Sequence, residues 1–490
     1  MFSHKWEDNE PLFQQVLQTA VYDLEKSPTH EKLQTFCRVV RDGGYEWAWS
    51  DTCCINKSDH FVLQEALVAM FKWYQGAART IVFLRGVRSL SQLGALVKSI
   101  WNTRAWTLQE YIASGVIHFY TEDWTLYLNL EIPNHKESCE VISEMEQATG
   151  VSAEQLMALR PGLTSIREKL RLASTRHTTL VEDAAYSLLG IFSVTGLPAI
   201  YGEGEGSLGR LLAHVLAGSG DLSVLAWTGE PGCFNSCLPA HVTVFNGPVT
   251  SHLPPPIPDA EMEQMILASH SSFDPGVALR LYDHLDKLSA PWFAASRMKL
   301  PCIAFQLPPL TPYRTRSGRV YRANTLAFGP VKIKTRYDLS RMESLYLIHP
   351  WLDSLLEHEP KGIIIGKDTA PPPSPARTDD DEFFENGNED EEEIPEEEYH
   401  DDSSSVGEPE LPSHPAPAHA EPLDREARAR RLVARLRQQF GALLVSPVES
   451  GRLSTSDYRR VAADSLITVR FQENVSLAEI LGNVRTLDVL

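Results

Sequence analysis

The 490-residue chain has few cysteines and no long apolar stretch. Its seven cysteines are odd in number and irregularly spaced, which argues against a disulfide framework and is typical of a reducing compartment. No apolar run approaches the ~20 residues that a membrane-spanning helix needs. Residues 1–10 carry several charges and lack the apolar core of a signal peptide. We therefore expect a cytoplasmic protein without a membrane span.

Basic residues are missing from one acidic segment. Between Asp379 and Asp402 there are 15 aspartates and glutamates and no lysine or arginine, within a chain of formal net charge −20. The charge thus belongs mainly to this segment and says little about partners. Proline and serine runs flank it, and such a composition buries too little apolar surface to offset the entropy lost on ordering. We predict a long disordered, acidic and Pro-rich insertion at 367–424.

Three motifs of common ligand sites are absent or incomplete. The chain has no P-loop and no repeat with a period of 20–50 residues. The glycines of 204–209 match G-x-G-x-x-G, but the preceding apolar stretch is too short for a strand, and Glu203 and Glu205 would repel a pyrophosphate. Cys233, Cys237 and His241 are widely spaced and have no fourth ligand. We expect no metal site and no required cofactor.

An arginine-rich segment at 425–437 is the one basic feature that could suggest nucleic acid. It follows the acidic segment directly and has no aromatic residues that could stack on bases. Pairing within the chain or a solvated helix face is favoured, so we expect no nucleic-acid partner.

Strands and helices alternate in the N-terminal region. Aromatic and small residues alternate in 45–51, and 80–84 and 116–120 are apolar runs, so all three segments are predicted strands. Between the first two strands, apolar residues from Phe61 to Tyr74 have helical spacing and Gly76 ends the helix. The segment Trp101–Ile112, between the second and third strands, is the second predicted helix. This order implies a parallel sheet with helices on its faces. We expect Trp47, Val82 and Ile117 to lie on central, buried strands.

The later part of the chain has a different periodicity. Apolar residues alternate with a period of two in 299–307, 319–328 and 331–337, and strand character returns near 442–445. This pattern predicts a second, β-rich domain. Because strand character lies on both sides of the acidic segment, we interpret that segment as an insertion inside the β-rich domain.

Several N-terminal segments together resemble the HET domain of fungal heterokaryon-incompatibility proteins, over roughly residues 1–228. In order along the chain they are Phe2–Asp8, Tyr45–Lys57, Met70–Leu84, Arg104–Ser114, Glu182–Phe192 and Tyr201–Gly204. The family usually has several residues before its Ser-His element, whereas only Met1 and Phe2 stand there in this chain. We therefore expect either a clipped first strand or a gene model that starts late.

The resemblance implies a fold and a domain organisation. HET domains are similar to TIR domains, so it implies an α/β, TIR-like (flavodoxin-like) parallel sheet. The expected parts are a HET core at 1–125, its helical extension at 126–228, a Pro-rich connector with one helix at 229–291, and a β-rich domain at 292–366 plus 425–490 that contains the insertion at 367–424.

The resemblance also implies a role in fungal non-self recognition, a form of innate immunity, with programmed cell death or growth arrest as output. Trp106–Glu110 is similar to the plant TIR pattern Trp-Cys-Leu-x-Glu, whose glutamate cleaves NAD. This similarity implies that Glu110 is a catalytic residue and that NAD is a substrate. The alternative is a signalling scaffold without chemistry. Since the chain has no sensor region of its own, self-association and a partner sensor protein are expected in either case.

The candidate substrate-binding residues are His4, Trp6, Asp51 and Trp106. Asp51 ends a predicted strand, where α/β folds collect polar groups, but it could equally cap the helix that follows. His4 and Trp6 lie at the end of the first strand and could instead be structural. Glu110 could pair with Arg104, and Trp106 could simply pack. The adjacent Cys53 and Cys54 are interpreted as buried thiols.

Overall fold

The computed structural model describes residues 1–247, 264, 274–315, 318–342, 344–350, 425–448 and 457–490. The predicted insertion at 367–424 lies outside the described residues, and so does part of the connector at 229–291. Within the described ranges, no helix combines the length and the apolar character needed to cross a bilayer.

The N-terminal region contains the predicted parallel sheet. Its strands are β1 (Phe2–His4), β2 (Thr80–Leu84) and β3 (Ile117–Thr121), hydrogen-bonded in the order β1-β2-β3. Val82 of β2 is paired with a residue of β1 on one side and of β3 on the other, and all three strands are parallel. The mixed α/β class with a parallel sheet is therefore confirmed.

The strand predicted around Trp47 does not form. In 45–50 only Ser50 pairs with the sheet, through a single parallel bridge to Phe2, and the Trp47 side chain is 88% exposed. The prediction of a central, buried strand was thus wrong for Trp47. It was right for Val82, while Ile117 is buried but lies on β3 at the end of the strand order. The three-residue β1 offers few backbone partners, so the segment beside it stays a loop.

A single bridge adds a fourth parallel partner to the three strands. Counting the Ser50 bridge, the order is Ser50, β1, β2, β3, which in chain order is second, first, third, fourth. In open α/β sheets, ligands bind beyond the carboxyl ends of the strands on either side of such a reversal. In this chain those strands are β1 and β2.

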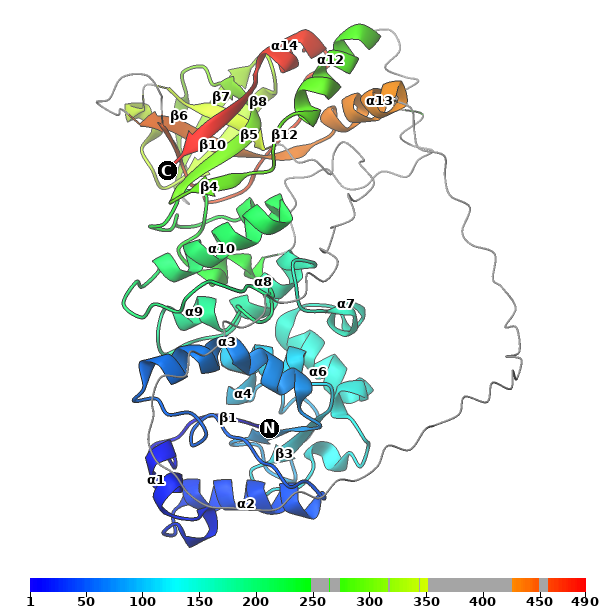
Figure 1. The fold of residues 1–490 in the computed structure, drawn as a ribbon. Helices are drawn as coiled ribbons and strands as arrows, with labels where there is room; N and C mark the ends of the chain where they lie inside the picture. Colours follow the sequence, from blue (N-terminus) through cyan, green and yellow to red (C-terminus); the bar gives the residue numbers. More distant parts are fainter. Residues whose placement is uncertain (248–263, 265–273, 316–317, 343, 351–424, 449–456) are drawn as a thin grey trace, which may run out of the picture. The chain divides into compact units, whose positions relative to one another are not determined.

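Helices cover both faces of this sheet (Figure 1). Side chains alternate between the faces of a strand, so Phe2, Ile81 and Phe83 meet α2 (Pro28–Asp42), where the Phe2 and Phe36 rings stack at 4.3 Å. The other face packs on helices α3 to α5. Their bounds, with that of the short first helix, are α1 Phe13–Gln18, α3 His60–Gly76, α4 Ile100–Thr103 and α5 Trp106–Ala113.

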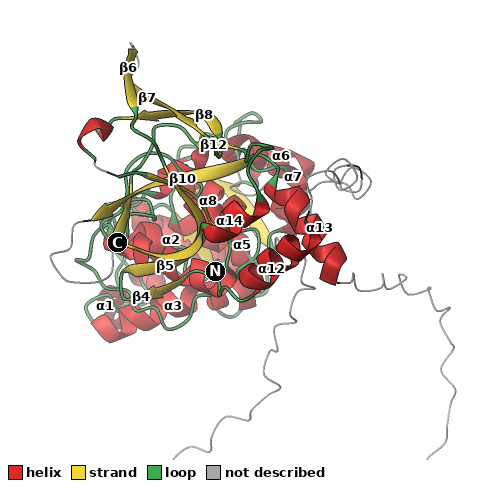
Figure 2. Cartoon of the chain, turned by 90° about the horizontal axis from the view of Figure 1, so that it is seen from above, coloured by secondary structure: helices red, strands yellow, loops and turns green. Residues whose placement is uncertain are grey.

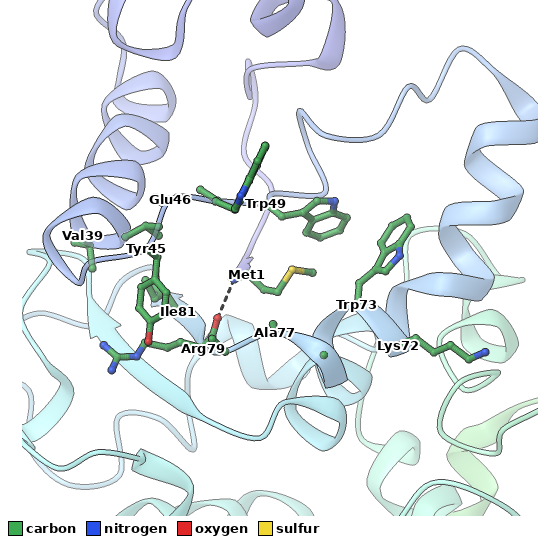
Figure 3. A pocket seen from close by; sticks show the side chains of 15 residues that line it. Met1, Val39, Tyr45, Glu46, Trp49, Lys72, Trp73, Ala77, Arg79 and Ile81 are labelled. Atoms are coloured by element: carbon green, nitrogen blue, oxygen red, sulfur yellow. Dashed lines mark hydrogen bonds between the residues drawn. The ribbon is translucent and has the colours of Figure 1, made fainter. Parts of the chain in front are cut away.

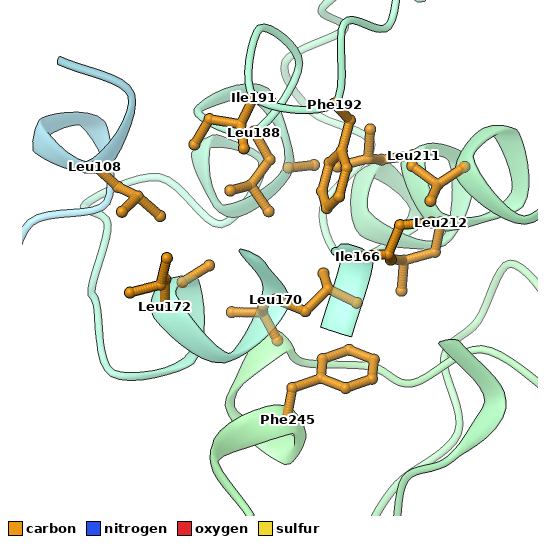
Figure 4. Close-up of a cluster of buried hydrophobic side chains, with 14 of the residues drawn as sticks. Leu108, Ile166, Leu170, Leu172, Leu188, Ile191, Phe192, Leu211, Leu212 and Phe245 are labelled. Atoms are coloured by element: carbon orange, nitrogen blue, oxygen red, sulfur yellow. The ribbon is translucent and has the colours of Figure 1, made fainter. Parts of the chain in front are cut away.

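Five short helices continue the apolar core beyond the sheet. They are α6 (Cys139–Thr149), α7 (Ala153–Ala158), α8 (Ile166–Ser174), α9 (Asp183–Tyr186) and α10 (Gly206–Ser219). Figure 4 shows part of this core, to which α5, α8, α10, the residues that follow α9 and the 3-10 helix Val242–Asn246 contribute: Leu108, Ile166, Leu170, Leu172, Leu188, Ile191, Phe192, Leu211, Leu212 and Phe245. These side chains are buried, which fixes α5 and its glutamate against the helical region.

The C-terminal region is rich in β-structure, as predicted (Figure 2). One sheet has the order β11-β13-β5-β9-β10-β12 with β4 beside β5, and a second has the order β6-β7-β8. The strands are β4 Trp292–Ala294, β5 Arg297–Gln306, β6 Thr311–Thr315, β7 Gly318–Thr325, β8 Gly329–Thr335, β9 Tyr346–Pro350, β10 Phe440–Val448, β11 Asp457–Arg460, β12 Ile467–Val469 and β13 Val484–Val489. The helices are α12 Pro275–Asp286, α13 Arg425–Leu436 and α14 Leu477–Gly482.

The strands on either side of 351–424 are neighbours. Strand β9 precedes that segment and β10 follows it, and the two pair antiparallel with Leu347 opposite Leu444. This is the pairing that an insertion within one β-rich domain requires. The arginine-rich α13 next to it pairs within the chain: Arg425 contacts Asp283, and Arg437 donates hydrogen bonds to the carbonyls of Gln472 and Val475.

Candidate functional site

Glu110 is held by a buried chain of hydrogen bonds that starts at Trp101. The Trp101 indole Nε1 donates to Ser3 Oγ at 2.6 Å, and Ser3 Oγ donates to Glu110 Oε2. An indole N–H can only donate and a hydroxyl has one proton, so the Ser3 proton points at Glu110. Glu110 is only 5% exposed. One oxygen of its carboxyl group is therefore fixed as an acceptor toward β1.

The surroundings of Glu110 raise its pKa to about 7. Burial is the main cause, because it disfavours the charged form, and the negative charge of Asp51 acts in the same direction. The Ser3 hydrogen bond and the positive charges of Arg104 and Arg176 oppose this rise in pKa. Glu110 is thus poised to exchange a proton near neutral pH.

Arg104 lies among the candidate residues without pairing directly with Glu110. Its Nη1 donates to the His4 carbonyl oxygen, and its charge acts on the pKa values of Asp51 and Glu110. Behind it, Arg176 Nη1 donates to the Arg104 carbonyl at 2.9 Å. The direct partner of Glu110 is Ser3, so Arg104 contributes through its positive charge and by tying α5 to β1.

Trp6 and Asp51 meet at the carboxyl end of β1. Trp6 Nε1 donates to Asp51 Oδ2 at 2.9 Å, and Lys57 Nζ lies 3.4 Å from the centroid of the Trp6 ring. Burial raises the pKa of Asp51, while Lys57 and Arg104 oppose that rise. The cap of α3 is Asp59, whose side chain accepts from the first helical N–H groups. Asp51 is therefore not the cap of α3, and its carboxylate can take part in the candidate site.

The side chain of His4 lies apart from Glu110. Strand alternation places it on the α2 face, where its ring stacks on Phe2 at 4.3 Å and its Nε2 is 3.7 Å from Glu10 Oε1. Burial and the nearby positive charges, Lys32 among them, lower its pKa well below the usual value. The structure thus separates the His4 side chain, which is neutral, from the side chains of Ser3 and Glu110.

Trp106 joins the site to the closing motifs of the domain. Its indole hydrogen-bonds the Asp183 carboxylate, and Tyr201 donates to the same group at 2.9 Å. Glu182 accepts from the backbone N–H of Gly202 at 2.8 Å. These hydrogen bonds hold the segments at 182–186 and 201–204 next to the start of α5.

Sequence reasoning did not name Ser3, Trp101, Arg104, Arg176, Asp183 or Tyr201 as site residues, and it considered Arg104 only as a partner with which Glu110 could pair. Four of them stand inside the quoted motifs, and the strand period alone places Ser3 on the sheet face opposite His4. That alternation was the available indication that Ser3, and not His4, would face α5.

The cysteine predictions hold in part. Cys53 is buried but Cys54 is exposed, so only one of the adjacent thiols is a core residue. Cys237 is buried while Cys233 is exposed. In the part of the chain that the structure describes, no three histidines, cysteines or acidic residues are grouped so that they could hold a metal ion.

Comparison with known proteins then identifies the N-terminal region. The family model described as "Heterokaryon incompatibility protein (HET)" matches residues 1–95. These residues of the chain are thus similar to the HET domain. The chain is also 34% identical, over 243 residues, to "Vegetative incompatibility protein HET-E-1" of Podospora anserina. That match covers 46% of this chain and 17% of the relative. No solved structure matches.

The family match and the site overlap only in part. Ser3, Trp6 and Asp51 lie within the matched residues of the HET domain, whereas Trp101 and Glu110 follow them in the chain. The hydrogen bonds described above join the two sets, because Ser3 contacts both Trp101 and Glu110.

Proposed function

We propose that this chain acts in fungal heterokaryon incompatibility, with the HET domain producing programmed cell death or growth arrest. The family match and the name of the Podospora anserina relative support this proposal. The chain matches only 17% of that relative's length. The trigger in this proposal is self-association together with a partner sensor protein.

The proposed chemistry is hydrolysis of NAD. The bond between the nicotinamide nitrogen and the anomeric carbon breaks, and its electron pair leaves with nicotinamide. Water adds to the cationic ribose and releases a proton. A carboxylate beside the ribose lowers the barrier by stabilising the positive charge that develops there. In this proposal Glu110 is that carboxylate.

The observation that carries the proposal is the fixed position of Glu110 among polar residues at the carboxyl end of β1. Its carboxyl group is oriented by Ser3, and its pKa is about 7, so a substantial fraction is ionised at neutral pH. The half-exposed Trp6 and Asp51 lie where a doubly wound sheet binds ligands. Their indole and carboxylate are suited to contact a ring and ribose hydroxyls.

A second candidate function is a scaffold without chemistry. The burial of Glu110 favours it, because a carboxyl group that is 5% exposed and hydrogen-bonded to Ser3 also serves simply to hold α5 against β1. In this case the HET domain would act by assembling with partners.

The deciding experiment expresses the full chain in a heterologous cell and follows intracellular NAD. Glu110→Gln keeps the size of the side chain and an oxygen that accepts from Ser3, but removes the charge. Removing one well-placed electrostatic group typically costs ~10²-fold or more in rate. Glu65→Gln, an exposed position on α3, is the matched control.

We expect the unmodified chain and Glu65→Gln to deplete NAD, and Glu110→Gln at equal abundance to leave it unchanged. Toxicity with a constant NAD level would refute the enzyme and favour the scaffold. Equal NAD loss in all three proteins would retain the enzyme and exclude Glu110 as its essential carboxylate.

A further inference from the structure

A cavity of about 680 Å³ lies beside the first strand, lined by residues different from those of the Glu110 site. Tyr45 and Trp49 lie on one side of it, and the C-terminal end of α3 with the residues that follow it lies on another (Figure 3). All five residues of the loop at 45–49, Trp47 included, line this space. The volume is in the range that proteins use for small ligands.

Three tryptophans line the cavity, and none of them is fully buried. Trp47 is 88% exposed, Trp73 is 39% exposed and Trp49 is half-buried. The Trp49 and Trp73 rings meet edge to face with centroids 5.4 Å apart, and Figure 3 shows them at one end of the cavity. Exposed aromatic groups gathered in one place are typical of a binding surface. Their flat faces are suited to a planar ring.

The other end of the cavity carries an uncompensated positive charge. Arg79 lies against the Tyr45 ring, with its Cζ 5.5 Å from the ring centroid. Among the described residues no carboxylate pairs with this guanidinium, and its buried Nε has no hydrogen-bond partner. Burial lowers the pKa of the nearby His118 and raises that of Tyr120, so both are uncharged at neutral pH. Neither can neutralise Arg79.

Glu46 and Lys72 also line the cavity. So does the Met1 amino group, which donates to the Arg79 carbonyl at 2.8 Å and whose pKa is lowered by burial to about 6. Glu46 is exposed at its rim, and the Lys72 ammonium group points away from it in Figure 3. The cavity therefore carries the Arg79 guanidinium beside Tyr45, an outward-pointing Lys72 ammonium group and the Glu46 carboxylate at its rim. An anion would be drawn to Arg79 and repelled by Glu46.

We propose that this cavity is a binding site for a planar aromatic anion. The ring of the ligand lies among the tryptophans, where stacking and burial of apolar surface hold it. Its negative group binds the Arg79 guanidinium, whose planar fork of donors suits a carboxylate or phosphate. The ligand class follows from the two ends of the cavity: aromatic at Trp49 and Trp73, cationic at Arg79.

The test titrates the full chain with three probes and follows heat of binding together with tryptophan fluorescence. Naphthoate has the ring and the negative charge, naphthylmethylamine has the ring with a positive charge, and cyclohexylacetate has the charge without an aromatic ring. We expect saturable binding of naphthoate at ~1 mM or tighter, the affinity typical of such a small ligand. The other two probes should bind at least tenfold more weakly.

Matched variants locate the two ends of the site. Arg79→Gln should weaken naphthoate binding about tenfold, because a charge-assisted hydrogen bond is lost. Lys72→Gln removes the same charge from a group that points away, so it should change the affinity less than twofold. Glu46→Gln should strengthen binding about threefold, since it removes a repulsive charge at the rim.

The tryptophans are tested in the same way. Trp47→Ala should weaken naphthoate binding about tenfold, whereas Trp292→Ala, which removes a half-exposed tryptophan on β4, should leave it unchanged. Trp47 buries little surface, so thermal unfolding of its variant should match that of the unmodified chain. The proposal is wrong if no probe binds saturably, if both naphthyl probes bind equally, or if Lys72→Gln weakens binding as much as Arg79→Gln.

Discussion

The Ser3 hydroxyl donates a hydrogen bond to the Glu110 carboxyl group, 107 positions later in the chain. This bond joins the first strand of the sheet to helix α5 and sets the direction of the one carboxyl group that the TIR-like pattern singles out. It has consequences for stability that are independent of any enzymatic activity.

Glu110 should make the stability of the protein depend on pH. Its pKa is about 7 in the folded protein against an ordinary 4.5. Between these values the unfolded chain has lost the proton that the folded protein keeps, so stability falls as the pH rises and the loss is complete above pH 7. At about 1.4 kcal/mol per pKa unit, the upper bound of this loss is about 3 kcal/mol. Glu110→Gln should abolish it.

The measurement is urea unfolding at several pH values between 4 and 8. The free energy of unfolding of Glu110→Gln, relative to that of the unmodified chain, should increase steadily over this range. Parallel pH profiles for the two proteins would contradict the raised pKa.

Ser3→Ala should destabilise the HET domain by about 2–4 kcal/mol, because it leaves the Trp101 N–H and the Glu110 carboxyl group buried without a partner. The exposed Ser58→Ala should stay within about 0.5 kcal/mol. Loss of the Ser3 hydrogen bond also removes one influence that lowers the pKa of Glu110. The pH-dependent loss of stability should therefore extend to higher pH in the Ser3 variant, and a shift to lower pH would contradict the assigned donor.

Gly190→Ala should destabilise the protein by about 3 kcal/mol or more, since overpacking of a dense core is not easily relieved. An added Cβ there would overlap the Phe71 side chain of α3. Gly76 is the matched control, because a Cβ at that position meets no atom within 4 Å and its φ is negative. The two alanine variants are compared by thermal unfolding, and equal midpoints would show that the contact relaxes freely.

Arg460→Met should cost about 3–5 kcal/mol, the range for breaking a buried polar network. The Arg460 guanidinium stacks on Trp227 at 3.9 Å and donates to the carbonyls of Leu225 and Trp227 at 3.0 and 2.8 Å. It thereby fastens strand β11 to the end of the helical extension. Arg459→Met changes the exposed neighbour and should have almost no effect. The free energy of unfolding of both variants is measured by urea unfolding, and limited proteolysis provides a second measure of their stability.

Local sequence patterns were sufficient for much of the secondary structure. The helical periodicity between the first two predicted strands correctly indicated α3, and the apolar runs at 80–84 and 116–120 became strands. These features depend on interactions between residues close in the chain, such as capping bonds and side-chain periodicity. The strand signature at Trp47 failed because a strand also needs a neighbour long enough to pair with, and β1 has only three residues.

The motifs also named most of the residues of the candidate site, but not their contacts. The sequence determined by itself that Ser3 and His4 face opposite sides of a strand, since that period is a property of the extended backbone. Only the tertiary structure decided that Ser3 meets Glu110, that Asp51 binds Trp6 and leaves the cap to Asp59, and that Arg79 faces an aromatic cavity. Burial and pairing between distant residues set these contacts and the pKa of Glu110, and no local pattern encodes them.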